Sequence, residues 1–288
     1  MFEILRQSLA LGVVTSDYPL TPAAVSDRAR GRPEIDYPRW RDARAAVAAC
    51  PTAALTATDQ AGERTTVLDL AHCIYCGCCA EADPAIRMTS DGELAAGRRV
   101  DLRATARYRL GPDGSHARLL EVVPAGLDAP GATELLGQAL RERIQRTLGR
   151  SLHVRQVDAG SCNGCEIEIG GLNSPVYDVE RFGVHFVPSP RHADLLLVTG
   201  PVTRNMELAL RKTYQATPEP RCVVAVGTCG CGGGIYGRNY ATRGGVDQVI
   251  PVDLYVPGCP PHPHALLRGL LLALGQWPAR AQPNPRVK

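Results

Sequence analysis

The chain has 288 residues, enough for about two domains, and its 44% hydrophobic and 21% charged residues supply material for packed cores. Its only lysines, Lys212 and Lys288, do not follow a glycine, which excludes the glycine-lysine phosphate loop of many nucleotide-binding enzymes. The net charge of +3 is too small for a nucleic-acid-binding surface.

Neither a membrane span nor a secretory signal is expected. No apolar run approaches the roughly 18 residues that cross a bilayer, and the N-terminus shows no basic segment followed by a cleavage site. We therefore expect the protein to stay in a reducing cytoplasm. In that compartment, eleven cysteines in short spacings indicate metal ligands or catalytic groups rather than disulfides.

Composition divides the chain into five segments. An apolar stretch at the start predicts one or two turns of amphipathic helix. The proline- and arginine-rich residues after it predict an extended segment that lies over another surface. The five segments are an extended N-terminal segment, 1–39; a cysteine-rich unit, 40–96; a hairpin with a helical linker, 97–150; an α/β half, 151–276; and a tail, 277–288.

The third segment combines strand and helix periodicity. Apolar residues alternate with polar ones from Val100 to Leu110, and a glycine-proline turn follows, which predicts a hairpin over 98–123. After a proline- and glycine-rich linker, apolar residues recur at helical spacing from Leu135 to Leu148. We therefore expect a hairpin and then one helix.

The half from residue 151 onward predicts a parallel sheet. Its predicted strands are continuous apolar runs, typical of strands buried on both faces, and helices are expected over 205–215 and 263–274. This alternation indicates a doubly wound, flavodoxin-like α/β fold, preceded by a small ferredoxin-like α+β domain. The strands are expected over 152–157, 184–187, 195–199, 222–227 and 252–256.

A first cysteine pattern lies in the second segment. Cys73, Cys76 and Cys79 form a C-x2-C-x2-C run, and Cys50 precedes a proline upstream. Bacterial two-cluster ferredoxins repeat C-x2-C-x2-C-x3-C-P, with the fourth cysteine of each repeat binding the other cluster. By this spacing, Cys50 is the fourth ligand of the set formed with Cys73, Cys76 and Cys79. This segment therefore resembles a bacterial-type ferredoxin domain with one [4Fe-4S] cluster. The positions of the other ligand set hold Trp40, Ala43, Ala46 and Asp83.

A zinc site is the alternative for these cysteines, because C-x2-C pairs also bind tetrahedral zinc. Zinc sites usually combine two separated pairs, whereas this chain has one tight run and a distant Cys50. The spacing therefore favours an iron–sulfur cluster. Cys78 lies inside the run but out of register, and we expect it to bind no iron.

Four further cysteines follow predicted strands. Cys162 and Cys165 come after the first strand of the α/β half, Cys229 after the strand over 222–227, and Cys259 after the last strand. Ligands of open α/β sheets bind at the carboxyl ends of the strands, where these loops can meet. Nearby glycines allow close approach of the backbone to a bound group. The pattern predicts a second set of four thiolate ligands.

The α/β half is similar to a known family, which includes the 20 kDa subunit of respiratory complex I and the small subunits of complex-I-related group 4 [NiFe] hydrogenases. The resemblance implies that Cys162, Cys165, Cys229 and Cys259 hold a [4Fe-4S] cluster. It also implies an electron-transfer subunit of a formate-hydrogenlyase-like complex on the cytoplasmic face of the inner membrane. The matching stretches are residues 158–166, 189–194, 199–203, 227–234 and 257–261.

The resemblance also defines the partners. It implies a [NiFe]-hydrogenase-like or complex I 49 kDa-like large subunit, together with further ferredoxin-like or membrane-arm subunits. The spacing of Cys162 and Cys165 matches hydrogenase small subunits, since complex I has two adjacent cysteines there. His262 and His264 stand where family members usually have Arg and Glu, so the partner contact or the proton path can differ.

Three other side chains near the second set have open roles. Cys231 could compete with Cys229 as a ligand, and we choose Cys229 because it matches the family position. Cys222 begins a predicted buried strand and is expected in the core. Glu166, beside a ligand, is a candidate proton relay, with an interface carboxylate as the alternative.

Three functions are compatible with these patterns. The first is an oxidoreductase subunit that relays electrons between a proximal cluster next to a catalytic large subunit and the N-terminal cluster, with no catalysis by this chain alone. The second is a component of a quinone- or ferredoxin-linked relative of complex I, similar to its 20 kDa subunit and without hydrogenase activity. The third is a zinc-binding scaffold. No cysteine follows Cys259, so a nickel site would lie in another chain.

Overall fold

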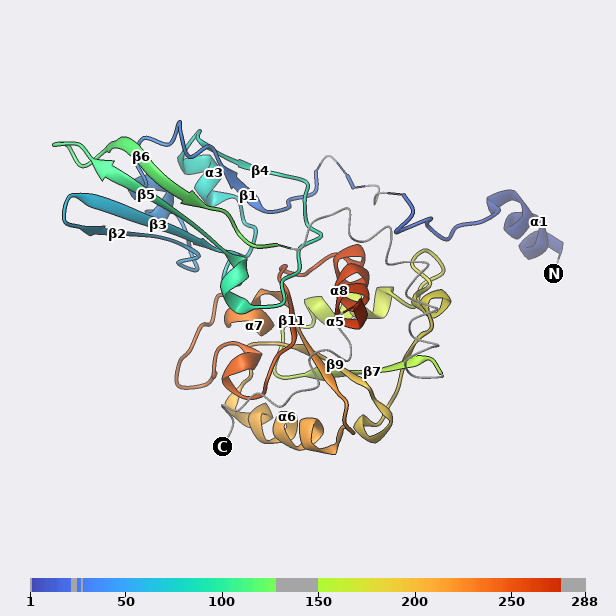
Figure 1. Ribbon diagram of the computed structural model, residues 1–288. Coiled ribbons are helices and arrows are strands. Elements are labelled where there is room, and N and C mark those ends of the chain that lie inside the picture. Colours follow the sequence, from blue (N-terminus) through green and yellow to red (C-terminus); the bar gives the residue numbers. More distant parts are fainter. Residues whose placement is uncertain (1, 22–24, 27, 128–149, 276–288) are drawn as a thin grey trace.

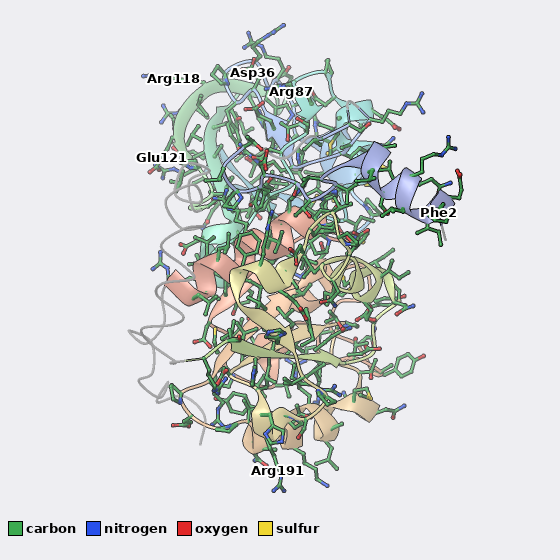
Figure 2. The ribbon with its side chains drawn as sticks, turned by 90° about the vertical axis from the view of Figure 1, so that its right-hand side faces the viewer. Phe2, Asp36, Arg87, Arg118, Glu121 and Arg191 are labelled. Carbon is green, nitrogen blue, oxygen red and sulfur yellow. The ribbon has the colours of Figure 1, made fainter. Side chains whose placement is uncertain are left out.

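The computed structural model describes residues 2–21, 25–26, 28–127 and 150–275. A mostly antiparallel lobe lies above a parallel α/β lobe, and α1 (Phe2–Leu11) projects to one side with none of its residues buried (Figure 1). Arg118 and Arg191 lie at opposite ends of the two stacked lobes, and Phe2 lies out to the side (Figure 2). The helix predicted between Leu135 and Leu148 and the tail over 277–288 fall outside the described residues.

The lower lobe contains the predicted parallel sheet. Its strand order is β8-β7-β9-β10-β11, and every neighbouring pair is parallel. All residues of β9 and β10 are buried, as their continuous apolar sequences require. The chain order reverses between β7 and β9, and this reversal is the switch point of a flavodoxin-like sheet. The strands are β7 (Leu152–Asp158), β8 (Val184–Phe186), β9 (Leu195–Thr199), β10 (Cys222–Val226) and β11 (Leu254–Val256).

Helices cover both faces of this sheet. Side chains of α5 and α8 pack with one set of alternate strand residues, such as Leu197, and side chains of α6 and α7 pack with the other set, such as Leu196. The expected doubly wound fold is therefore confirmed. No helix in the described part of the chain has the length and apolar character needed to cross a bilayer. The helical elements are α5 (Gly164–Gly171), α6 (Arg204–Ala216), α7 (Gly227–Gly232), α8 (Pro263–Gly275), η2 (Val179–Phe182), η3 (Pro190–His192) and η4 (Val246–Gln248).

The upper lobe contains two antiparallel sheets and two short helices. The larger sheet has the order β2-β3-β5-β6, and β1 pairs with β4 in the smaller one. Alternate residues of β3 and β5 point into a core that continues into the lower lobe. The elements are β1 (Pro33–Ile35), α2 (Arg44–Ala48), β2 (Leu55–Gln60), β3 (Glu63–Asp69), α3 (Cys78–Ala82), β4 (Ile86–Met88), η1 (Arg99–Leu102), β5 (Arg103–Leu110) and β6 (His116–Val123).

The predicted hairpin is present as β5 and β6, but its first strand begins later than expected. Residues 99–102 form the short helix η1, so Val100 is 56% exposed and does not face the core. Seven residue pairs join β5 to β3, and the larger sheet therefore crosses the boundary expected between residues 96 and 97. The hairpin belongs structurally with the cysteine-rich unit that precedes it.

Candidate metal centres

Four cysteines meet at the carboxyl edge of the parallel sheet, and we call them the C-terminal set. Cys162 follows β7, Cys165 lies in the first turn of α5, Cys229 lies in α7 behind β10, and Cys259 follows β11. Parallel strands end at the same edge, so these distant loops become neighbours. Cys162 and Cys259 are exposed, and Cys165 and Cys229 are partly buried. The set therefore opens onto the protein surface.

Two glycines leave room for the sulfur atoms of this set. A Cβ on Gly227, whose φ is +77°, would lie 2.5 Å from Sγ of Cys165. A Cβ on Gly234, whose φ is +55°, would lie 2.8 Å from Sγ of Cys229. Both approaches are too close for any side chain, and left-handed torsions favour glycine. The backbone is thus shaped around the two thiols.

The four thiols of the C-terminal set influence one another electrostatically. Burial raises the pKa of Cys229 to about 11, and negative charge on Cys259 and Cys162 adds to this rise. The pKa of Cys165 is raised further, first by burial and then by charge on Glu166 and on the other three cysteines. Four thiolates this close are unfavourable without a compensating cation. The donor set is suited to a positively charged metal group, which would hold the thiols deprotonated.

Cys231 and Cys222 lie apart from the C-terminal set. Cys231 is fully buried, and its thiol donates a hydrogen bond across 3.5 Å to the carbonyl oxygen of Ala225 in β10. Cys222 is 5% exposed at the start of β10, as expected of a core cysteine. Of the two cysteines in α7, Cys229 is therefore the one whose thiol faces the other three.

A second group of four cysteines gathers in the upper lobe, and we call it the N-terminal set. Cys50 follows α2, Cys73 and Cys76 lie in the loop between β3 and α3, and Cys79 lies in α3. Burial raises the pKa of Cys73 to about 12, and charge on the other three cysteines contributes. The backbone N–H of Tyr75 donates to Sγ of Cys73 across 3.4 Å. The loop thus turns a backbone donor toward a thiol, as a cluster-binding loop does.

Cys78 is placed differently from the N-terminal set. It lies partly buried at the start of α3, and a hydrogen bond with Cys76 raises its pKa. Burial raises the pKa of Cys73 and of Cys79, and charge on Cys50 and Cys76 adds to both rises. That Cys78 binds no iron stays a prediction.

The positions that lack cysteines in the ferredoxin-like pattern form a packed core. Trp40 is 1% exposed, and Ala43 and Ala46 are fully buried in the same hydrophobic cluster. These three positions are therefore occupied by tightly packed apolar side chains.

The thiols are not arranged around a single ion. No group of three His, Cys, Asp or Glu side chains within the described ranges is positioned to hold one metal ion. Tetrahedral zinc needs its ligand atoms within about 2.3 Å of the metal. Neither cysteine set is preformed around one such ion in the part of the chain that the structure describes.

Glu166 lies at the switch point of the sheet. Its Oε1 accepts a hydrogen bond from the hydroxyl of Thr199 at the end of β9, and its Oε2 is buried with no hydrogen-bond partner among the described residues. Charge on Glu166 also raises the pKa of Cys165. The carboxylate is thus next to the C-terminal set. Sequence reasoning missed Thr199 because nothing in its spacing relates it to a cysteine.

His262 and His264 form an aromatic group with two tyrosines. The rings of Tyr18 and Tyr177 lie 4.6 Å and 5.0 Å from that of His264, and His262 lies 5.0 Å from it. Both histidines line a cavity of about 480 Å³ that also reaches Cys259. The unusual histidines of this loop therefore pack together beside one end of the C-terminal set.

The cysteines of the C-terminal set coincide with a known family. Residues 162–273 match the family described as NADH ubiquinone oxidoreductase, 20 Kd subunit. The probable membrane-bound hydrogenase subunit mbhJ of Pyrococcus furiosus is 52% identical over 132 residues, a match that covers 46% of this chain and 79% of that protein. The chain belongs to this family of oxidoreductase subunits. All four cysteines of the C-terminal set lie in the matched region, and the N-terminal set lies outside it.

Other relatives extend the comparison. Formate hydrogenlyase subunit 7 of Escherichia coli (strain K12) is 45% identical over 150 residues, covering 52% of this chain and 59% of that protein. The chain thus spans less than two thirds of that relative. A chain of the membrane-bound sulfane sulfur reductase, an archaeal respiratory membrane complex, is 36% identical with a TM-score of 0.40, covering 50% of this chain and 77% of that one.

Proposed function

We propose that this chain is the electron-transfer subunit of a complex-I-related, hydrogenase-type complex. Each of the two cysteine sets would hold one [4Fe-4S] cluster, and electrons would pass between them. The observation that carries this proposal is that two separate sets of four thiols gather at loops, each with raised pKa values at some of its thiols. Glycines leave room for sulfur in the C-terminal set, and a backbone N–H donates to sulfur in the N-terminal set.

The residues present fit an iron–sulfur cluster. Cysteine thiolates are the usual ligands, and burial, backbone donors and nearby charge tune the reduction potential. When bound, such a cluster accepts and releases single electrons. The chain contributes the thiolates, the backbone donor at Tyr75 and the space next to Gly227 and Gly234. Residues 40–96 and 151–276 would serve as the ferredoxin-like and proximal cluster units.

The catalytic site would lie in a partner large subunit. Cys162 and Cys259 are exposed, so a partner can approach the C-terminal set to within a short electron-transfer distance. The relatives named above are subunits of a formate hydrogenlyase and of a membrane-bound hydrogenase. On that basis we propose a large subunit with nickel, membrane-arm partners and a peripheral position on the cytoplasmic face of the membrane.

A relative of complex I without hydrogen chemistry is the second candidate. The family description supports it, and so do His262 and His264, which replace the Arg and Glu expected beside Cys259. The large subunit distinguishes the two candidates. Nickel in the co-purified complex supports the hydrogenase-type function, and a nickel-free complex with quinone- or ferredoxin-linked activity supports the second.

Iron analysis and EPR spectroscopy of the full chain, purified without oxygen, test the proposal. We expect about eight irons per chain, and about four after Cys76→Ala, with the signal of the other cluster retained. Cys78→Ser is the matched control and should keep all eight irons. A folded protein that is colourless, with about two zinc ions, would overturn the proposal in favour of a zinc scaffold. Loss of both EPR signals in folded Cys76→Ala would contradict the assignment of two sets.

A further inference from the structure

The two lobes are joined by backbone contacts close to both cysteine sets. Ala96 and Tyr255 of β11 exchange two backbone hydrogen bonds of 3.0 Å and 2.9 Å in an isolated antiparallel bridge. A Cβ on Gly232 would lie 2.5 Å from the carbonyl oxygen of Ala71, so the lobes touch there without side chains between them. Nε of Arg99 also donates to the carbonyl oxygen of Cys231 across 2.9 Å.

Thr228 makes the contact that lies directly between the two sets. Its hydroxyl oxygen is 2.8 Å from the carbonyl oxygen of Cys73 and 3.0 Å from that of Gly258. The backbone N–H of Thr228 already donates to Gly258 across 2.7 Å. A hydroxyl has one proton to donate, and the shorter distance directs it to Cys73. Thr228 is 1% exposed, so water does not compete for this bond.

This hydrogen bond makes a short connection between the sets. Cys73 belongs to the N-terminal set, and Thr228 is covalently joined to Cys229 of the C-terminal set. Gly258, which accepts from the Thr228 amide, is joined to Cys259. One hydrogen bond therefore links a ligand residue of one set to ligand residues of the other. Electrons tunnel more readily along bonded and hydrogen-bonded atoms than across van der Waals gaps.

Tyr75 is a side chain that lies near both cysteine sets. Burial raises the pKa of Tyr75, and charge on Cys73 and on Cys259 adds to this rise, so the phenol lies within reach of both sets. Its hydroxyl is buried. The cavity that reaches Cys259 is also lined by Tyr75, whereas the Thr228 contact itself is buried.

We propose that the hydroxyl of Thr228 is a positioning contact that couples the two cysteine sets and sets the rate of electron transfer between the clusters they hold. This inference rests on the proposed function. In the step, one cluster loses one electron and the other gains it. No covalent bond changes, and the Thr228 proton stays on its oxygen.

The test compares Thr228→Val with Thr228→Ser in the full chain loaded with both clusters. Valine has the same shape but cannot donate, and serine keeps the hydroxyl. A photoexcited deazaflavin delivers less than one electron per chain, and freeze-quench EPR follows its redistribution between the two cluster signals. We expect valine to slow this redistribution several-fold and serine to restore it. Thr217→Val, which alters a buried threonine at the end of α6, is the matched control and should leave the rate unchanged.

The outcomes separate this inference from the proposed function. If the wild-type chain lacks either cluster, the proposed function fails. If both clusters are present and Thr228→Val transfers electrons at the wild-type rate, only the role of Thr228 is overturned. If Thr228→Val loses a cluster, the smaller Thr228→Ala repeats the test. Cluster loss in both variants, with serine intact, would show that the hydroxyl holds the cysteine loop and would overturn a role in transfer rate.

Discussion

Nε1 of Trp40 donates a hydrogen bond to Oδ2 of Asp83 across 3.0 Å. These residues occupy two of the four positions at which a second ferredoxin cluster would need cysteines. The indole also packs edge-on against Tyr108 and His116, at ring distances of 6.1 Å and 5.4 Å. An aromatic core with several hydrogen bonds thus stabilises this part of the lobe.

This relationship predicts a loss of stability without a loss of iron when Trp40 is changed. Trp40→Ala should lower the free energy of unfolding by about 3–5 kcal/mol because a large buried ring is removed. Trp40→Phe keeps most of the packing and should cost less, with about 1 kcal/mol attributable to the lost hydrogen bond. Thermal unfolding without oxygen ranks the stability of the wild type, Trp40→Phe and Trp40→Ala. A drop of about four irons in folded Trp40→Phe would contradict this interpretation.

The fold of the α/β half could be predicted from sequence because its strands are identified locally. The strand predicted over 195–199 matches β9, and the one over 222–227 differs from β10 by one residue, since unbroken apolar runs between polar turns fix such elements. The strand predicted over 252–256 is shorter as β11, because its register of paired residues with β10 begins at Leu254.

Contacts between distant segments could not be predicted in this way. Periodicity predicted the β5 strand but contains no information on its pairing with β3, so the sheet that crosses residue 96 was not foreseen. The Thr228 hydroxyl meets Cys73 across 155 residues of sequence. The cysteine sets were predictable because the spacing of their cysteines reflects binding to one shared group. Thr228 shows no such pattern in the sequence, apart from its position next to Cys229.

The structure predicts different outcomes for the two cysteines of α7. Cys229→Ala should remove about four irons, because its thiol faces the rest of the C-terminal set. Cys231→Ala should keep them, because the thiol of Cys231 is buried and bonded to Ala225. Iron analysis of both variants measures the difference. Retention of all irons in Cys229→Ala and their loss in Cys231→Ala would reverse the assignment.

His264 predicts a pH dependence of stability. Burial, with charge on His262 and Arg181, lowers the pKa of His264 to about 4, against about 6.5 in an unfolded chain. Between these values the unfolded state binds the proton and the folded state does not, so stability is full above about pH 6.5 and decreases as the pH falls toward 4.

A variant isolates this contribution. Between pH 7.5 and 5.5 the wild type should lose about 1 kcal/mol more stability than His264→Leu, which has no proton to bind. Denaturant unfolding at both pH values measures this difference, and other titrating groups cancel in the comparison. Equal pH dependence in the two proteins would show that His264 is not held neutral by its surroundings.

Glu166 is the candidate proton relay beside the C-terminal set, and Glu166→Gln tests that role in the assembled complex. Glutamine keeps the size of the side chain and an oxygen for the Thr199 hydroxyl, but it cannot take up a proton. Proton-transfer groups typically contribute about a hundredfold or more to the step they serve. We therefore expect proton-coupled turnover to fall by about this factor where proton transfer limits the rate, while iron content stays unchanged.

The cluster potential separates a proton relay from a purely electrostatic role. Removing the negative charge next to Cys165 should make the cluster of the C-terminal set easier to reduce, a shift seen in an EPR-monitored redox titration. Glu168→Gln, two residues along α5, is the matched control and should leave turnover at the wild-type level. If Glu166→Gln shifts the potential but leaves turnover unchanged, the carboxylate tunes the cluster and the protons take another path.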